Sequence, residues 1–269
     1  MAEDSPQPLS SFGEFLSLNS VQPGGILPLV HGTPAYHIKS IGKSNKIVAS
    51  PCEVFVGDNL NYLFVGRPAY KRTVDEGETP FWELPCCFIF DFKTIGEIKR
   101  IFPFDSGAFV KGLYPSYISM MGADNFEVSA VNDAPSRIIG AFFGDAKKYL
   151  ELKPKGDHAF EAEFELSPLD AEVRAIHRLA LEKQASSFDD RRLTIEMQTT
   201  GDIDLTVTKP LAVIAPNVYF NDKAFLYKVE TEWGAQPIGY NLHPLNLSAY
   251  YTQIYEQVAE FYRKIGAIS

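Results

Sequence analysis

Short runs of aromatic, β-branched and other apolar residues, bounded by Gly, Pro or Asn, recur along the chain and constrain its fold more than any other feature. Runs of this length and composition are typical of β-strands. Segments with a helical pattern are fewer, and strands and helices do not alternate regularly, so the sequence predicts an α+β fold. The predicted strands cover residues 26–30, 52–56, 62–65, 86–90, 192–198, 203–207 and 211–215.

Three segments are expected to form helices. In the first, Thr33 suits the N-cap, Pro34 suits the first helical position, and Gly42 suits a C-terminal stop. The second helix, residues 167–183, begins with a similar Ser-Pro pair, and the third, residues 248–265, carries aromatic and aliphatic residues on one face. The apolar stripe predicted for the second helix consists of Val173, Ile176, Leu179 and Ala180.

The first 25 residues differ in composition from the rest of the chain. They are rich in Ser, Pro, Gly and Gln, which predicts a flexible leader, with Phe12, Phe15 and Leu16 as the side chains able to dock on the body. No polar linker or repeat interrupts residues 26–269, so a single domain is expected there.

Residues 103–125 combine Gly, Pro and aromatic residues and predict a long irregular connection. Such connections in compact domains often act as a lid or a binding element. The run Phe104-Asp-Ser-Gly107 within it is similar to the triplet of aspartic peptidases, but a second such carboxylate is missing from the sequence. A turn is therefore expected at this run.

Charge and hydropathy limit the classes of partner. The 269 residues include 25 Lys and Arg against 34 Asp and Glu, a formal charge of −9, which excludes a chain-wide basic surface for generic nucleic-acid binding. The start of the chain lacks the basic and apolar regions of a signal peptide, and no apolar run approaches the roughly 18 residues of a membrane span. We therefore expect a cytoplasmic protein without a membrane contact.

Several common catalytic patterns are absent from the sequence. These are the dinucleotide-binding and phosphate-binding Gly-rich loops, the zinc-protease helix and the nucleophile elbow. Cys52, Cys86 and Cys87 form an odd set without CxxC spacing, which predicts free thiols in the core. His31 and His37 are six residues apart, a separation that does not place them on one helical face, so no metal site is expected.

Three segments together resemble a known family. Leu29-Val-His-Gly-Thr33, followed by a short helix and Gly42, resembles the first NAD-binding motif of ADP-ribosyltransferases of the diphtheria-toxin and poly(ADP-ribose) polymerase type. Tyr62-Leu-Phe-Val-Gly-Arg-Pro-Ala-Tyr70 resembles the Phe-x-x-Arg-Ser-Pro stretch of DarT-type enzymes, which ADP-ribosylate DNA bases. Glu196 stands where the family carries a glutamate on a later strand. The resemblance implies a split pair of small sheets around an NAD cleft, with flanking helices and a C-terminal helix packed alongside.

The resemblance also implies which residues hold NAD, the expected substrate. His31, Gly32 and Thr33 are expected to bind it, with His31 on the ribose hydroxyls and Gly32 leaving room for close approach of the carboxamide. Tyr62 or Tyr70 is expected to stack on the nicotinamide ring.

The catalytic residues implied by the resemblance are Glu196, Arg67 and His31. Cleavage of the nicotinamide bond passes through an oxocarbenium-like ribose, and the Glu196 carboxylate is expected to stabilise that charge and to orient the acceptor. Because Ile195 and Met197 flank it on a strand, Glu196 is expected to face a cleft or solvent if those two face the core. Arg67 is expected near the acceptor or a phosphate. Other glutamates that remain open for the catalytic role are Glu161, Glu163, Glu165 and Glu172.

The expected function is NAD-dependent mono-ADP-ribosylation of a macromolecular acceptor, either a nucleic-acid base or a protein, by a bacterial toxin or anti-phage effector that an antitoxin could inhibit. For a nucleic-acid acceptor, Arg67, Lys71 and Arg72 are expected at the mouth of the cleft. Two alternatives stay open. One is an NAD glycohydrolase, and the other is a catalytically silent module that binds a partner through the aromatic residues of the C-terminal helix, Tyr250, Tyr251, Tyr255 and Phe261.

Overall fold

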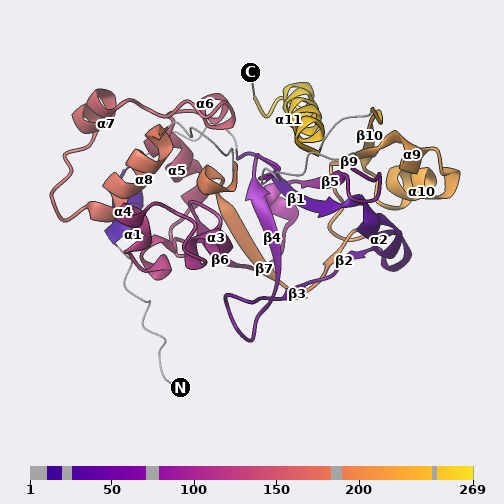
Figure 1. The fold of residues 1–269 in the computed structure, drawn as a ribbon, viewed down its shortest axis with the longest axis horizontal. Helices are drawn as coiled ribbons and strands as arrows, with labels where there is room; N and C mark the ends of the chain where they lie inside the picture. The colour runs from indigo at the N-terminus through magenta and orange to yellow at the C-terminus, as the bar shows by residue number, and fades with distance from the viewer. Residues whose placement is uncertain (1–10, 20–25, 71–78, 183–189, 244–246, 269) are drawn as a thin grey trace.

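A β-sheet crosses the middle of the molecule and carries helices at both ends (Figure 1). The computed structural model describes residues 11–19, 26–70, 79–182, 190–243 and 247–268. Helices α1 and α4–α8 gather at the end next to β6, and α2, α9 and α10 gather at the end next to β9 (Figure 1). This arrangement of a mostly antiparallel sheet with flanking helices confirms the α+β class.

The main sheet has eight strands in the order β10-β9-β5-β1-β4-β7-β6, with β3 paired to β4, and β2 and β8 form a separate pair. Neighbours in the main sheet are antiparallel apart from β9 and β10, which run parallel. The strands are β1 (Leu29–Pro34), β2 (Lys46–Ile47), β3 (Ser50–Pro51), β4 (Asn59–Val65), β5 (Pro85–Phe90), β6 (Ile98–Phe102), β7 (Glu196–Thr200), β8 (Ile203–Asp204), β9 (Ala212–Pro216) and β10 (Gln236–Tyr240).

The sheet is weakly joined at its centre. Strand β1 pairs with β5 along its whole length, from Leu29 to Pro34, but pairs with β4 only through Leu29↔Val65 and Val30↔Phe64. On this edge the start of β4 pairs with the short strand β3, and the opposite edge of β4 pairs with β7 from Leu60 to Phe64. Beyond Val30 the two strands separate, with β10, β9, β5 and β1 in one half of the sheet and β4, β7 and β6 in the other. The two halves remain joined, so the described strands form one sheet and not the split pair of small sheets that the resemblance implied.

The helices are mostly short. They are α1 (Ser11–Leu18), α2 (Ile38–Ser44), α3 (Ser106–Val110), α4 (Ser116–Ser119), α5 (Ala134–Phe142), α6 (Ala146–Leu150), α7 (Asp157–Glu163), α8 (Ala171–Leu181), α9 (Asn217–Phe220), α10 (Lys223–Tyr227) and α11 (Leu247–Lys264). Single turns of other helix types are η1 (Ala35–His37), η2 (Phe92–Thr94), η3 (Ala123–Phe126), η4 (Asp190–Leu193) and η5 (Lys228–Glu232). The 18-residue helix α11 lies beside the centre of the sheet (Figure 1).

Three of the seven predicted strands agree closely with the structure, namely those at β4, β5 and β9. The strand predicted for residues 26–30 overlaps β1 only at Leu29 and Val30, because β1 begins later and continues to Pro34. The prediction for residues 52–56 is wrong, because the Sγ atom of Cys52 accepts the backbone N–H groups of Val54 and Phe55 and so closes a turn. The strand predicted for residues 192–198 begins later, at Glu196, and the one predicted for residues 203–207 stops at Asp204.

The helix after β1 begins and ends later than predicted. Thr33 and Pro34 belong to β1, where they pair with Cys86 and Pro85, so strand pairing overrides their local capping preference. Helix α2 continues through Gly42 and ends at Ser44, where Asn45 adopts the left-handed conformation with φ 56° that suits a C-cap.

The two other predicted helices are present. Helix α8 starts at Ala171 and not at Ser167, because Asp170 accepts the Ser167 backbone N–H and makes a preceding turn. Its predicted apolar stripe is buried, and α11 matches the prediction for residues 248–265 within a residue at each end.

Part of the predicted leader is a packed helix. Helix α1 buries Phe12, Phe15 and Leu16, so the docking of these three side chains is confirmed and the expectation of a flexible segment is wrong for residues 11–18. Phe12 packs edge-on against Phe126. The remainder of the predicted leader, residues 1–10 and 20–25, lies outside the described residues.

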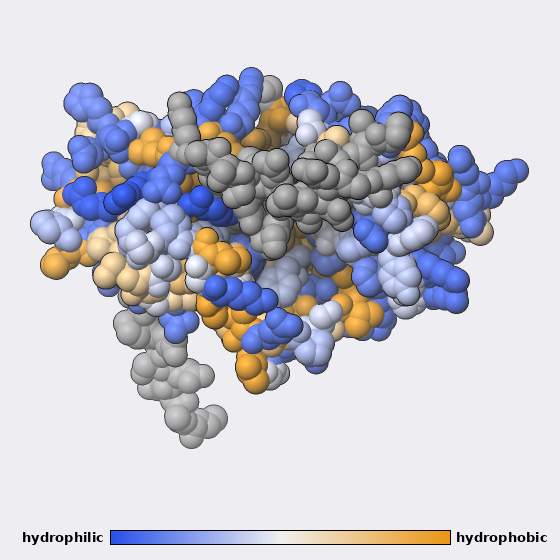
Figure 2. All heavy atoms as spheres, in the orientation of Figure 1, coloured by the Kyte–Doolittle hydropathy of each residue, from blue (hydrophilic) through white to orange (hydrophobic). Residues whose placement is uncertain are grey.

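Residues 103–125 contain short helices in place of the irregular connection that was predicted. Phe104, Phe109 and Tyr114 of this segment belong to the core, and the rings of Phe104 and Phe109 stack 4.7 Å apart. Hydrophilic residues predominate on the described surface in Figure 2, with hydrophobic side chains in separate groups between them. Among the described residues, none of the helices is both long and apolar enough to cross a membrane.

Candidate functional site

A cavity of about 320 Å³ opens where β1 and β4 separate. Its walls come from the end of β1, the middle of β4, helix α2 and the β2 segment. Four of the predicted site residues, His31, Gly32, Thr33 and Tyr62, line this one cavity. The remaining lining residues are His37, Ser40, Ile41, Ser44, Lys46, Ile47, Val48, Ser50, Leu60 and Asn61.

His31 is fixed to β4 by its ring. The Nδ1 atom lies 3.0 Å from the main-chain carbonyl oxygen of Tyr62, and because a carbonyl only accepts, Nδ1 carries the proton. Burial lowers the pKa of His31, and the charge of nearby His37 lowers it further, against the hydrogen bond to Tyr62, which acts in the opposite direction. His31 is therefore neutral at pH 7, with Nε2 as a hydrogen-bond acceptor.

The charged residues that line the cavity differ from those of the chain as a whole. Of the described residues that line it, none is Asp or Glu, whereas His31, His37 and Lys46 all belong to it. Lys46 is half-exposed and lies 3.7 Å from Asp202, an ion pair at the rim. In a chain with a net charge of −9, such a lining favours an anionic ligand with hydroxyl groups.

Glu196, the first residue of β7, is buried with 1 % of its surface exposed. Ser106 donates its hydroxyl to Oε1 at 2.6 Å and its backbone N–H to Oε2 at 3.2 Å. The Nε2 atom of Gln198 also donates to Oε1, at 2.8 Å. The expectation that Glu196 would face an open cleft or solvent is therefore wrong, because Ser106, which begins α3, covers it.

The environment of Glu196 favours the protonated form. Burial raises the pKa of Glu196 from 4.5 to about 7, and the nearby carboxylate of Asp105 contributes in the same direction. The hydrogen bonds from Ser106 and Gln198 oppose this rise. A carboxyl group that titrates near neutral pH can accept a proton in a reaction at that pH.

Tyr62 lines the cavity and lies on the same face of the sheet as Glu196, whereas Glu196 itself does not line the cavity. The partner of Tyr62 across the β4–β7 ladder is Gln198, and the next pair on the same face of the sheet is Phe64 with Glu196. The Tyr62 hydroxyl lies 2.9 Å from Sγ of Cys52. Burial raises the pKa of Tyr62, the Cys52 thiol raises it further, and the charges of Glu196 and Asp105 add to the effect.

Tyr70 lies against Gly32 but does not line the cavity. A Cβ atom on Gly32 would lie 3.4 Å from Cε1 of Tyr70, so the two residues are in van der Waals reach. The Tyr70 ring stacks on Tyr251 of α11 with centroids 4.3 Å apart and meets Tyr255 edge-on. The C-terminal helix thus covers one face of Tyr70.

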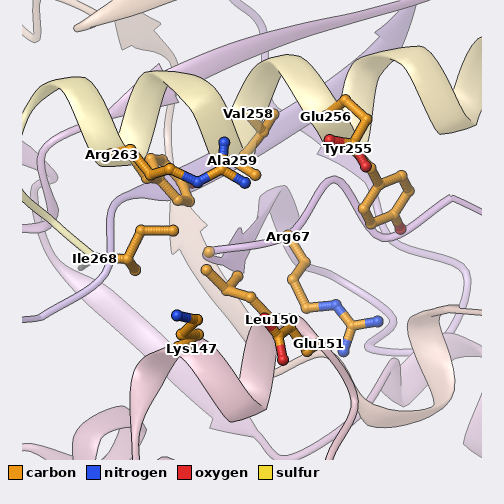
Figure 3. Close-up of a pocket in the computed structure, with 12 residues that line it drawn as sticks. Arg67, Lys147, Leu150, Glu151, Tyr255, Glu256, Val258, Ala259, Arg263 and Ile268 are labelled. Atoms are coloured by element: carbon orange, nitrogen blue, oxygen red, sulfur yellow. The ribbon is translucent and has the colours of Figure 1, made fainter.

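Arg67 belongs to a second cavity, of about 520 Å³, between α6 and α11 (Figure 3). Its side chain is 2 % exposed, with the guanidinium over the Tyr149 ring and Nη1 donating to the Tyr149 carbonyl. Lys147 and Arg263 line the same cavity, which shares no lining residue with the cavity of His31. The structure therefore does not bring Arg67 to the His31 cavity. Lys71 and Arg72 lie outside the described residues.

The other glutamates considered for the catalytic role lie elsewhere. Glu161 and Glu163 are on the surface of α7, Glu165 follows that helix, and Glu172 lies on α8. Of the five candidates, Glu196 is the one in a strand next to β4.

The structure adds residues that the sequence analysis did not single out. Ser106 and Gln198 bind Glu196, Cys52 contacts Tyr62, and Lys46 lines the cavity. The sequence could have indicated Gln198 as a neighbour of Glu196, because residues two apart on a strand share a face. It could not have indicated Ser106, since 90 residues separate Ser106 from Glu196.

The free state predicted for the thiols is confirmed for all three cysteines, and the core location is confirmed for Cys86 and Cys87. Cys52 is only partly buried. Among the described residues, no group of three or more His, Cys, Asp or Glu side chains is placed to hold a metal ion.

The site and the sheet around it define an α+β protein with a polar cavity, lined by Lys46 and by no described Asp or Glu, where β1 and β4 separate. Comparison of the chain with protein-family models, curated proteins and solved structures finds no match.

Proposed function

We propose that the protein is an NAD-dependent mono-ADP-ribosyltransferase that binds NAD in the cavity of His31. The observation that carries this proposal is that the three segments that resemble the family lie close together in the structure. His31 and Tyr62 touch across the break in the sheet, and Glu196 lies on the next strand, on the same face as Tyr62. These residues are 31 and 134 positions apart in the sequence, so local structure does not account for their proximity.

The cavity lining suits the parts of NAD. His31, whose Nδ1 is held by Tyr62, offers Nε2 as an acceptor for a ribose hydroxyl. Lys46 suits the negatively charged diphosphate, whereas the hydroxyls of Ser40 and Ser44 already donate to the main-chain oxygens of His37 and Ser40. Gly32 lines the cavity with its backbone, and Tyr70 lies on the side where a Cβ atom would be.

Glu196 supplies the carboxyl group that the reaction needs. The bond between the ribose carbon and the nicotinamide nitrogen breaks, and nicotinamide leaves with the electron pair. A nucleophilic atom of the acceptor forms the new bond to that carbon, and its proton passes to the Glu196 carboxylate. Because Glu196 is buried, a substrate hydroxyl reaches it only by taking the place of the Ser106 hydroxyl.

The acceptor follows from the resemblance alone. The likeness of residues 62–70 to DarT-type enzymes favours a nucleic-acid base over a protein, in a cytoplasmic toxin or anti-phage effector with an antitoxin as its natural inhibitor. The net charge of −9 favours a short, local contact with single-stranded nucleic acid over a broad phosphate-binding surface.

The two alternative functions are not equally favoured. An NAD glycohydrolase uses the same residues with water as the acceptor. A silent module that binds through α11 is less favoured, because Tyr250 and Phe261 are buried and Tyr251 stacks on Tyr70, so these aromatic side chains pack within the protein.

The test combines calorimetry with labelled NAD. The wild-type protein is expected to bind NAD and to transfer label to single-stranded DNA or RNA, or to protein in a cell lysate. His31→Ala is expected to weaken binding, and Glu196→Gln is expected to bind NAD but to transfer label at least 100-fold more slowly. Glu165→Gln is the matched control, since it changes an exposed glutamate.

The possible outcomes separate the three functions. Free ADP-ribose and nicotinamide without labelled acceptor identify a glycohydrolase, and an absence of binding heat identifies a silent module. Label transfer that is unchanged in Glu196→Gln contradicts the proposed mechanism.

A further inference from the structure

Glu196 is connected to the surface by a chain of polar contacts that ends at Arg100 on β6. Arg100 and Gln198 are partners in the β6–β7 ladder, and Phe102 and Glu196 are the next pair on the same face. Nη1 of Arg100 donates to Oε1 of Gln198 at 3.2 Å. Nε2 of Gln198 in turn donates to Oε1 of Glu196 at 2.8 Å and to the Ser106 hydroxyl at 3.0 Å.

The two ends of the Gln198 amide are held by groups of opposite kind. A guanidinium has donors and no acceptor, so it binds the oxygen end of the amide. A carboxylate in its ionised form has acceptors only, so it binds the nitrogen end. Arg100 on one side therefore fixes which end of Gln198 faces Glu196 on the other.

Arg100 is itself held in place on its outer side. Nη1 lies 2.9 Å from Oδ2 of Asp58, and the guanidinium lies over the Phe55 ring, 4.1 Å from its centroid. Asp58 also binds Nζ of Lys99 at 2.5 Å. Ring, carboxylate and amide thus fix the planar guanidinium from several directions.

We propose that Arg100 is a positioning residue for Glu196, because it orients the Gln198 amide so that Nε2 donates to the Glu196 carboxylate. Without Arg100 the oxygen end of the amide loses its partner, so the Nε2 end is held toward Glu196 and Ser106 less firmly. The hydrogen bond from Gln198 favours the ionised form of Glu196 and lowers its pKa, so this change disfavours the ionised form.

Other groups also act on Glu196. Asp105 and Tyr62 lie close enough for their charges to matter, and Ser106 donates two hydrogen bonds. Gln198 also donates to the Ser106 hydroxyl, so the effect of Arg100 on Glu196 passes through Gln198 both directly and by way of Ser106.

The test follows the Glu196 carboxyl directly, by ¹³C NMR titration of the full chain, with the resonance assigned by its loss in Glu196→Gln. Arg100→Gln is expected to raise the pKa of Glu196 by about one pH unit. Lys99→Gln is the matched control, because it removes the same charge and also breaks a contact with Asp58, while the hydrogen bond from Arg100 to Gln198 stays in place. It is expected to leave the titration within about 0.3 of wild type.

A double-mutant cycle isolates the route through Gln198. In a Gln198→Ala background, Arg100→Gln is expected to have no further effect on the Glu196 titration. Gln198→Leu, which fills more of the space, takes the place of Gln198→Ala if that variant unfolds. An unchanged titration in Arg100→Gln overturns the proposal, and so does an equal rise with and without Gln198.

The consequence for catalysis rests on the proposed function and is measured separately. In Arg100→Gln the pH profile of label transfer is expected to move to higher pH by the same amount as the Glu196 titration, with KM for NAD unchanged. If no variant or wild-type protein transfers label, the proposed function fails while the titrations still decide the role of Arg100.

Discussion

The Ser106 hydroxyl donates to Oε1 of Glu196 at 2.6 Å, although the two residues are 90 positions apart in the chain. Ser106 begins α3 directly after Asp105, whose side chain caps that helix by accepting the backbone N–H of Ala108. The turn that delivers Ser106 therefore also delivers the carboxylate of Asp105, which raises the pKa of Glu196. One short turn both holds the candidate catalytic group and makes it harder to ionise.

Glu196 is expected to make the protein less stable as pH rises. Its pKa is raised from 4.5 to about 7 on folding, so the folded state binds the proton more tightly than the unfolded state between these values. The free energy of unfolding then falls from pH 4.5 to pH 7 by up to about 3 kcal/mol and is constant with respect to this group at higher pH. Urea unfolding at pH 5 and pH 8 is expected to show this loss in wild type and not in Glu196→Gln.

Glu165→Gln serves as the control for that comparison, because Glu165 is exposed on the surface after α7. It is expected to keep the wild-type dependence on pH. The prediction is contradicted if Glu196→Gln and Glu165→Gln have the same difference in unfolding free energy between pH 5 and pH 8.

Removal of a positive charge is expected to weaken NAD binding when the charge lines the His31 cavity, and not when it lines the cavity of Arg67. Lys46→Gln removes a cation from the lining of the His31 cavity and is expected to raise the Kd for NAD about tenfold and to reduce its dependence on salt. Arg263→Gln removes a cation from the cavity that Arg67 lines and is expected to leave the Kd within about twofold of wild type. Calorimetry at two salt concentrations checks both, and a larger effect of Arg263→Gln would move the binding site to the second cavity.

Gly239→Ala is expected to destabilise the parallel pair of β9 and β10. A Cβ atom at Gly239 would lie 1.6 Å from Oδ1 of Asn217, so Asn217 has to rotate and give up its hydrogen bond to Asn241. The expected cost is about 1–3 kcal/mol, measured by thermal or urea unfolding. Gly96→Ala is the control, because no atom lies within 4 Å of a Cβ there.

A second substitution tests the cause of that loss. Asn217→Ala removes the atoms that a Cβ at Gly239 would meet, so the double variant is expected to be less destabilised than the sum of the two single variants. Additive losses would show that the close approach to Asn217 is not the reason.

Helix α1 is expected to be part of the cooperative fold. Phe12 is fully buried and packs against the rings of Phe126 and Phe142, so Phe12→Ala is expected to lower the free energy of unfolding by about 3–5 kcal/mol. Leu18→Ala changes an apolar residue of the same helix that is 85 % exposed, and it is expected to cost less than about 0.5 kcal/mol. Equal, small losses would mean that α1 is only loosely attached.

The elements that could be predicted from sequence are those whose apolar pattern is local and complete. Strand β5 is a continuous apolar run that is buried on both faces, and α11 repeats its apolar residues at helical spacing. The elements whose predicted ends were wrong depend on partners that are distant in sequence. Thr33 has the chemistry of an N-cap, yet pairing with Cys86 across β1 and β5 keeps it in a strand.

The candidate site shows the same limit. His31 and Tyr62 were predictable from the motifs around them, and the structure brings them into contact. The burial of Glu196 was not, because it depends on Ser106, and strand alternation alone predicts an exposed face opposite Met197. Arg67 carries a charge that suggests a surface role, but its place beneath α6 and α11 is set by long-range packing against Tyr149.

The break between β1 and β4 also determines how the chain can be divided. Following the sequence, β1 lies in one half of the sheet, β4 in the other, β5 in the first again, β6 and β7 in the second, and β9 and β10 in the first. The two halves are thus interleaved along the sequence, and neither is encoded by a continuous stretch. No single cut in a loop between these strands separates one half from the other, so the two halves cannot be produced as two separate fragments of the chain.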